Sequence, residues 1–357
     1  MPKSHQPSDM AEPSSKTRNS GENAPRVVLR TSQIRLTVSA LGARICALDL
    51  YEDSDSSGTN IAIGLADDAA YLAQDSYIGA VCGRYANRIE KARYTDPDGH
   101  DVTLFANEGE THLHGGKDGF DRRVWDIADQ SETIVTFKLT SPDGDQGYPG
   151  TLNATATYSI VGENRVRLDI SATCDAPCPV NMTSHAYWNL TGKFDQSATD
   201  HVLKITANHW LPVDEKLIPL ADKRDVTGTG YDFRSPARIS DMLPRATQGF
   251  DHNFCLTGDR GALRHIATLS DPDSGRSIEL SSTEAGLQFY LSQHFTDAMK
   301  SATGVPLHTS AGIALEPQTW PNSPNRPDFP SPWLKPGETY QHVIEWEFSN
   351  RLFNFSS

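Results

Sequence analysis

The sequence has 357 residues, 37% of them hydrophobic, with 46 acidic side chains against 32 basic ones. It is long enough for a substantial core, and its acidic balance makes nucleic acid and anionic membranes poor partners. No stretch approaches the about 20 consecutive apolar residues that span a bilayer. The five cysteines are an odd number scattered along the chain, which argues against a disulfide framework and favours the reducing cytoplasm.

The first 25 residues are rich in serine, proline and charge and lack the apolar middle of a secretion signal. They predict a disordered N-terminal tail, residues 1–25, followed by one domain over residues 26–357.

Most of the remaining chain alternates apolar and polar residues, which is the pattern of a strand with one buried face. The alternation predicts strands over residues 34–38, 135–139, 152–160, 166–170 and 340–348. The third and fourth of these flank Gly-Glu-Asn and therefore predict a hairpin.

Apolar spacings of three and four occur only in short pieces such as residues 65–72, so helices contribute little. We therefore expect an all-β protein, a single large antiparallel β-sandwich. Residues 318–338 carry six prolines and cannot form a central strand, because proline lacks the N–H that a ladder requires. This segment is expected to wrap an edge or to wall a site.

Two ionisable residues stand in apolar surroundings. His185 lies within the strand-like NMTSHAYWNL, residues 181–190, and Glu316 follows the apolar Ile313, Ala314 and Leu315. A buried histidine with satisfied hydrogen bonds and a structural ion pair are the ordinary explanations. The alternative is an acid–base pair, since burial raises a carboxyl pKa and imidazole titrates near neutrality.

Other polar residues carry two interpretations each. Asn87 and Arg88 belong either to a surface turn or to a set of donors for the hydroxyls of a neutral ligand. His112 and His114, two apart on a possible strand, could share a face and bind a metal, but no third ligand is evident. His114 would otherwise be a turn histidine, and Asp251 a turn former or an acceptor for sugar hydroxyls.

At these residues the sequence resembles the aldose 1-epimerase, or galactose mutarotase, family over roughly residues 30–350. The similar segments, in family order, are GRYANRI (83–89), LHGG (113–116), GFDRRVW (119–125), DQGYPG (145–150), NMTSHAYWNL (181–190), GFDHNF (249–254) and LEPQ (315–318). Singly they are weak, but together and in order they are specific.

The resemblance implies a galactose mutarotase-like supersandwich with no cofactor and no metal. By position, Glu316 corresponds to the general base and His185 to the general acid. The sugar-binding positions correspond to Asn87, Arg88, His114, Tyr187, Asp251 and Gln288. Trp188, Pro317 and the residues after Tyr290 depart from the family pattern; they are expected to line or adjoin the site and to affect sugar preference.

The function implied is interconversion of the α and β anomers of free hexoses of the glucose or galactose type, by opening and reclosing the ring. The alternatives are a mutarotase of hexose 6-phosphates, a non-catalytic carbohydrate-binding sandwich, and a glycosidase using Glu316 with Asp251. The expected partner is a small aldose, not nucleic acid or a membrane, and the expected assembly is a cytoplasmic monomer or homodimer.

Overall fold

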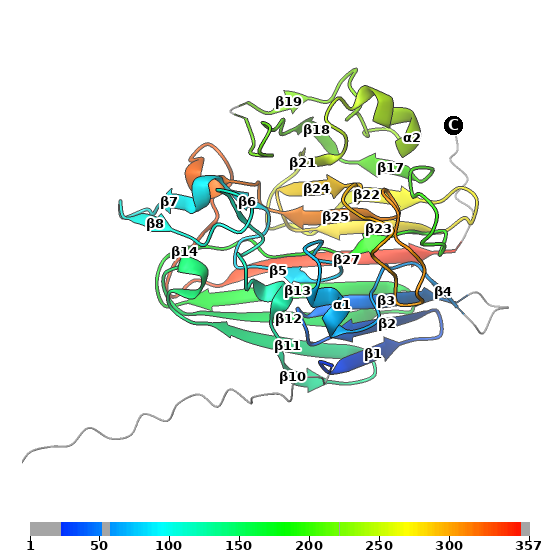
Figure 1. Ribbon diagram of the computed structural model, residues 1–357, viewed down its shortest axis with the longest axis horizontal. Coiled ribbons are helices and arrows are strands. Elements are labelled where there is room, and N and C mark those ends of the chain that lie inside the picture. Colours follow the sequence, from blue (N-terminus) through cyan, green and yellow to red (C-terminus); the bar gives the residue numbers. More distant parts are fainter. Residues whose placement is uncertain (1–22, 52–57, 221, 351–357) are drawn as a thin grey trace, which may run out of the picture.

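Antiparallel strands are the main regular structure of the computed structural model, which describes residues 23–51, 58–220 and 222–350 (Figure 1). Residues 1–22 of the predicted tail lie outside the described residues. Of the three tail residues that are described, Ala24 is buried against the core. Among the described residues no helix is both long and apolar enough to cross a membrane.

The largest sheet has nine strands, in the order β10-β11-β12-β13-β27-β23-β22-β17-β20. Their bounds in that order are Asp126–Gln130, Ile134–Ser141, Leu152–Val161, Arg165–Cys174, Tyr340–Ser349, Ser277–Ser282, Arg264–Ser270, Val202–Ile205 and Ala237–Arg238.

Two further sheets have four and six strands. The four-stranded sheet is β1 (Arg26–Arg30), β2 (Ile34–Ser39), β3 (Arg44–Leu50) and β4 (Thr59–Asn60). The six-stranded sheet runs β16 (Tyr187–Trp188), β25 (Ile313–Gln318), β24 (Gly286–Tyr290), β21 (Asp251–Leu256), β18 (Ala207–Trp210) and β19 (Arg224–Asp225).

Short strands pair outside these sheets. The pairs are β14 (Cys178–Pro179) with β26 (Trp333–Leu334), β15 (Thr183–Ser184) with β5 (Val81–Cys82), β6 (Arg88–Ile89) with β9 (His112–Leu113), and β7 (Arg93–Thr95) with β8 (Asp101–Thr103). The helices are α1 (Asp68–Leu72) and α2 (Ile239–Met242), with 3₁₀ turns η1 (Glu90–Ala92), η2 (Phe120–Arg122), η3 (Asp145–Gly147), η4 (Leu243–Arg245) and η5 (Ser323–Asn325).

The predicted strands are confirmed as parts of β2, β11, β12, β13 and β27. The predicted hairpin is β12–β13, which pairs Val161 with Arg165 across a turn containing Gly162 at φ 67°. Alternate residues of both strands are buried, as a half-buried strand requires. The short helical pattern at residues 65–72 becomes α1, capped by Asp67, whose side chain accepts from the Ala70 N–H.

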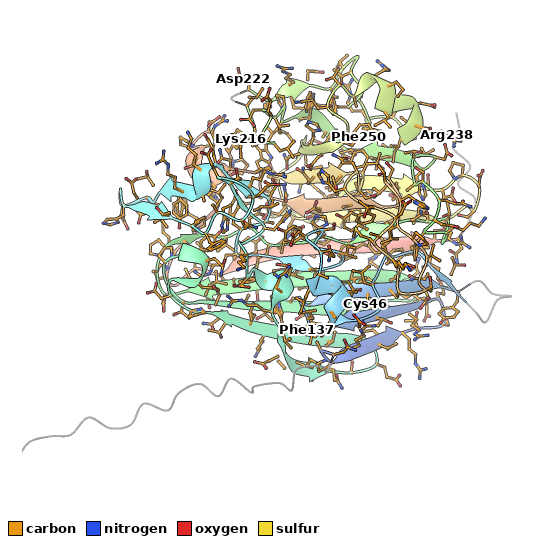
Figure 2. The ribbon with its side chains drawn as sticks, in the orientation of Figure 1. Cys46, Phe137, Lys216, Asp222, Arg238 and Phe250 are labelled. Carbon is orange, nitrogen blue, oxygen red and sulfur yellow. The ribbon has the colours of Figure 1, made fainter. Side chains whose placement is uncertain are left out.

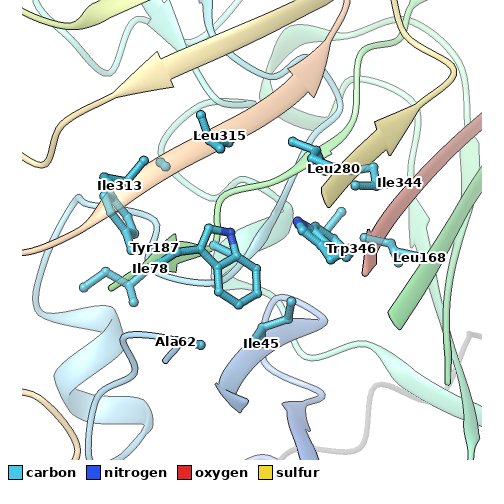
Figure 3. Packing of buried hydrophobic residues seen from close by; sticks show 14 of the residues in the cluster. Ile45, Ala62, Ile78, Leu168, Tyr187, Leu280, Ile313, Leu315, Ile344 and Trp346 are labelled. Atoms are coloured by element: carbon cyan, nitrogen blue, oxygen red, sulfur yellow. The ribbon is translucent and has the colours of Figure 1, made fainter. Parts of the chain in front are cut away.

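The main core lies between the nine-stranded sheet and the other two sheets. Figure 3 shows Ile313 and Leu315 of β25 facing Leu280, Ile344 and Trp346 of the nine-stranded sheet. Figure 2 shows how side chains fill these layers, with Cys46 and Phe137 in the lower half of the view and Phe250 in the upper half. All five cysteines are buried and unpaired.

The other face of the six-stranded sheet carries polar side chains. In β25 the side chain of Leu315 points into the core, and that of Glu316 points to the opposite face of the sheet, where it is also buried. The proline-rich segment at 318–338 closes over this region: Asn322 donates its N–H to the carbonyl of Arg88, and Trp320 accepts from the Tyr85 hydroxyl. Its later residues add the edge pair β26–β14. Pro317 is tolerated in β25 because its neighbour β16 pairs only with Ile313 and Ala314.

Candidate active site

His185 and Glu316 meet although they lie 131 positions apart in the sequence. The imidazole Nε2 lies 3.5 Å from the carboxylate Oε1. The two residues are 4% and 1% exposed, so the contact is shielded from solvent. Neither His185 Nδ1 nor Glu316 Oε2 has a hydrogen-bond partner among the described residues.

The backbone fixes the position of His185 between β15 and β16. Its N–H donates to the carbonyl of Ala80 at 2.8 Å, and its own carbonyl accepts from Gly79 at 2.9 Å. The ring packs against Tyr187, with centroids 4.9 Å apart, and 6.0 Å from the Tyr77 ring. The imidazole therefore has little freedom to turn away from Glu316.

Burial moves the two pKa values in opposite directions. It raises the pKa of Glu316 well above its ordinary value; the nearby Asp251 adds to this shift and Arg88 opposes it. Burial lowers the pKa of His185 to about 4. Both shifts have the same cause: burial disfavours the charged carboxylate and the charged imidazolium.

Gln288 and Asp251 extend the polar face beside Glu316. Gln288 of β24 lies directly opposite Glu316 in the ladder, and its Nε2 donates to Asp251 Oδ1 at 2.6 Å. Both side chains are buried. Asp251 Oδ2 lies 3.9 Å from Arg88 Nη1, so the carboxylate faces a cation on one side and an amide on the other.

Arg88 is buried, contrary to the solvated turn that is its ordinary explanation. Its guanidinium makes a bidentate contact with Glu108, at 2.7 and 2.8 Å, and is 6% exposed. Burial lowers the Arg88 pKa, but the hydrogen bonds to Glu108 and the charge of Asp251 outweigh it and raise the pKa overall. The preceding Asn87 adopts φ 63° and accepts the Arg88 N–H on its side-chain oxygen at 2.8 Å.

His114 faces His185 from the third side, with ring centroids 5.3 Å apart. Its Nδ1 accepts the backbone N–H of Asn87 at 3.2 Å, which assigns the proton of the neutral ring to Nε2. Burial, followed by the charges of His185 and Arg88, lowers the His114 pKa well below its ordinary value. The ring is therefore a neutral donor.

Distances alone would allow His114, His185 and Glu316 to hold a metal, since their ligand atoms lie within 4.8 Å of one another. The hydrogen bonding of His114 opposes it. A ligating histidine donates its second N–H to an acceptor, whereas Asn87 presents an N–H donor to Nδ1 of His114. The site is thus arranged for hydrogen bonding to a neutral polar molecule.

Of the two interpretations of His112 and His114, a shared strand face is not what the structure shows. β9 ends at Leu113 and His114 turns aside at φ 48°. His112 faces a separate buried cluster, where its Nδ1 contacts the Phe105 carbonyl at 2.7 Å and its Nε2 the Tyr148 hydroxyl at 2.7 Å. It is a satisfied core histidine.

Tyr187 lies behind the imidazole. Its hydroxyl donates to the Ser76 carbonyl at 3.1 Å, and its ring packs on Phe295 as well as His185. Sequence reasoning did not find Tyr77, whose ring lies 4.4 Å from that of His114, or Glu108, the partner of Arg88. Both lie in loops, where no periodic pattern marks a side chain as facing a site.

The fold and these residues define an antiparallel β-sandwich protein whose buried site pairs a carboxylate with an imidazole among neutral hydrogen-bonding groups. The sequence profile described as aldose 1-epimerase matches residues 25–347. The chain belongs to the aldose 1-epimerase family.

Relatives support this assignment over most of the chain. An Escherichia coli (strain K12) aldose 1-epimerase is 41% identical over 302 residues, 83% of this chain and 86% of the relative. A Sus scrofa galactose mutarotase is 38% identical over 322 residues, 90% and 93% respectively.

Solved structures agree. An aldose epimerase homologue from C. elegans has a TM-score of 0.84 at 27% identity and covers 92% of this chain and 100% of its own. Galactose 1-epimerase from Lactobacillus acidophilus has a TM-score of 0.80 at 26% identity, covering 94% and 97%.

Proposed function

We propose that the protein is a mutarotase that interconverts the α and β anomers of free aldohexoses of the glucose or galactose type. Family membership makes it an aldose 1-epimerase, an isomerase. The observation that supports the mechanism is the 3.5 Å contact between His185 Nε2 and Glu316 Oε1, which is shielded from solvent.

Ring opening needs a base at the anomeric hydroxyl and an acid at the ring oxygen. In the reactive form His185 Nε2 carries a proton and Glu316 is a carboxylate. Glu316 takes the proton of the anomeric hydroxyl while His185 gives its proton to the ring oxygen. The bond between C1 and the ring oxygen breaks and C1 becomes an aldehyde. Rotation about C1–C2 and the reverse transfers close the ring as the other anomer.

The remaining residues hold the sugar. Asn87, Arg88, His114, Asp251 and Gln288 supply donors and acceptors for ring hydroxyls, and Tyr187 fixes the His185 ring. Because Nδ1 of His114 accepts the Asn87 N–H, its Nε2–H can donate to an oxygen of the sugar.

An unphosphorylated sugar fits the charges better than a hexose 6-phosphate. Arg88 is the cation whose charge acts on Glu316, and Glu108 and Asp251 already neutralise it. A phosphate would meet these two carboxylates without a free cation to offset them. Rates on glucose and glucose 6-phosphate test this choice; faster mutarotation of the phosphate would contradict it.

Polarimetry tests the activity directly. Freshly dissolved α-D-glucose or α-D-galactose should reach its equilibrium rotation much faster with the protein than without it. Sugar binding without acceleration would indicate a non-catalytic binding protein, and release of reducing sugar from an oligosaccharide would indicate a glycosidase. We further propose that the protein is cytoplasmic and is a monomer or homodimer. Light scattering on the purified protein tests the state of assembly.

A further inference from the structure

Two buried amides, Asn253 and Gln318, lie on the same sheet face as the acid–base pair. Asn253 lies directly opposite Gln288 in the β21–β24 ladder, and Gln318 follows Glu316 by two residues in β25. Because side chains two apart along a strand share a face, these four residues form one continuous polar surface. The amides lie on the side of Glu316 that points away from β16.

Neither amide has a partner among the described residues. The oxygen and the nitrogen of Asn253 and of Gln318 are all buried without a hydrogen bond, at 2% and 0% residue exposure. Other buried amides are bonded: the Asn181 side chain donates to the Ala86 carbonyl and accepts from Thr319, and the Asn189 nitrogen donates to the Ala311 carbonyl. An unpaired buried amide costs free energy, so the exception at this surface requires an explanation.

Neighbouring atoms on the same surface are also unpaired. Gln288 uses its nitrogen on Asp251, and its Oε1 is without a partner among the described residues, as is Glu316 Oε2. The open backbone of Gly286, opposite Gln318, makes room for this group: a Cβ there would lie 2.4 Å from Asn253 Oδ1 and 2.9 Å from Cδ1 of Trp320. A side chain at position 286 would displace the Asn253 amide.

We propose that Asn253 and Gln318 are specificity-determining residues that bind one hydroxyl group of the aldose beside Glu316. This inference rests on the proposed function and deepens it. Each amide offers N–H donors and a carbonyl acceptor, and a hydroxyl both donates and accepts, so the two chemistries match. The amides carry no charge, which suits a neutral sugar and not a phosphate or a metal ion.

Unpaired amides that bind sugar should affect stability and activity in opposite directions when they are replaced. Replacing Gln318 with methionine, or Asn253 with leucine, keeps the approximate volume and removes the unpaired polar atoms. Without sugar these variants should therefore melt at a higher temperature than the parent. With sugar they should lose the contact. If the amides had only a structural role, both variants would instead melt at a lower temperature than the parent.

The deciding experiment pairs Gln318→Met and Asn253→Leu with hexoses that lack one hydroxyl each. Mutarotation rates are measured on glucose and its 2-, 3-, 4- and 6-deoxy forms, and 1,5-anhydroglucitol, which lacks the anomeric hydroxyl, is tested as a competitor. In each variant we expect kcat/KM, or the affinity of the competitor, to fall about tenfold for every sugar that retains the hydroxyl bound by the amides. For the single analogue that lacks this hydroxyl, the change should be less than about twofold. An equal loss for every sugar, or no loss for any, overturns the inference.

Controls separate this result from misfolding and from failure of the proposed function. Gln341→Met makes the same replacement at an exposed position of β27 and should leave all rates unchanged. Asn253→Ala serves where the bulkier leucine fails to fold. If the parent protein does not accelerate mutarotation, the proposed function fails, and calorimetric binding of the same sugars to parent and variants still decides the role of the amides.

Discussion

Two buried histidine–glutamate arrangements among the described residues differ in how their hydrogen bonds are used. In the core, His342 contacts the Met182 carbonyl through Nδ1 at 2.9 Å and the Ser282 hydroxyl through Nε2 at 3.0 Å. The adjacent Glu284 is paired with Arg260 at 3.0 Å. In the site, His185 leaves Nδ1 and Glu316 leaves Oε2 unpaired among the described residues.

This difference separates a structural arrangement from a reactive one. Burial lowers the pKa of both histidines, so the pKa shift alone does not tell them apart. What differs is the number of polar atoms kept available. Unpaired polar atoms lower the free energy of unfolding of the protein without sugar. In the reaction the same atoms can form hydrogen bonds that stabilise the transition state.

The largest effect should come from changing the two glutamates. Glu316→Gln removes the base and should lower kcat by about 10² to 10⁴, because proton transfer by a positioned group contributes a factor of that size. It should leave the melting temperature unchanged or higher, since the substitution removes a buried acidic group whose Oε2 has no partner among the described residues. Glu284→Gln should instead lower the melting temperature and leave kcat per folded molecule near that of the parent. A loss of activity in Glu284→Gln alone would break the comparison.

The histidines provide the second test. His185→Asn should reduce kcat by about 10² to 10⁴ by removing the acid. His342→Asn should leave kcat within about threefold but cost stability of about 1–3 kcal/mol, because buried partners lose their bonds. Polarimetry and thermal unfolding of the same preparations give both values. Activity retained in His185→Asn would rule out the proposed acid.

Acid should destabilise the fold through its buried histidines. The pKa of His112 and of His252 is lowered from 6.5 to about 4, with burial as the main cause. Between these values the unfolded chain binds protons that the folded protein does not, so stability falls as the pH falls from 6.5 to 4, by about 1.4 kcal/mol per pKa unit for each group. Urea unfolding at pH 7 and pH 5 measures this. His185 adds little to this dependence, because burial lowers its pKa but raises the pKa of its partner Glu316. His252→Asn should flatten the dependence, and an unchanged slope would contradict the lowered pKa of His252.

Sequence periodicity predicted much of the fold because half-buried strands have a local signal. The β12–β13 hairpin and β27 follow it closely. The strands of the six-stranded sheet are different: every residue of β21, β24 and β25 is buried, so the alternation that would reveal them is lost. Trp188 was expected to line or adjoin the site, but it packs on the core side against Trp346.

For the site, sequence identified the residue types and not their contacts. Glu316 could be recognised because it interrupts an apolar run, and the family resemblance aligned it with His185. The 3.5 Å contact depends on the pairing of β16 with β25, which no local pattern encodes. The bond from Asn87 to His114 Nδ1, which sets the histidine tautomer, depends on two left-handed residues in separate loops.

The arginines beside the two glutamates extend the comparison to substrate binding. Arg88→Lys keeps a charge but loses the bidentate contact with Glu108, so we expect KM to rise about tenfold with a smaller change in kcat. Arg260→Lys breaks a similar contact with Glu284 and should reduce stability only. Initial rates over a range of sugar concentrations separate KM from kcat. An unchanged KM in Arg88→Lys would remove Arg88 from the binding residues.

The smallest effect should come from the tyrosine hydroxyls of the two regions. The Tyr187 hydroxyl donates to the Ser76 carbonyl, so Tyr187→Phe should cost about 1 kcal/mol of stability and about threefold in kcat/KM, because the phenyl ring still supports His185. Tyr340→Phe should cost more stability and no activity, since the Tyr340 hydroxyl accepts the Met182 N–H and lies 3.5 Å from Glu284. A drop in kcat/KM above about 30-fold in Tyr187→Phe, which is more than a single neutral hydrogen bond provides, would show that the hydroxyl contacts the sugar.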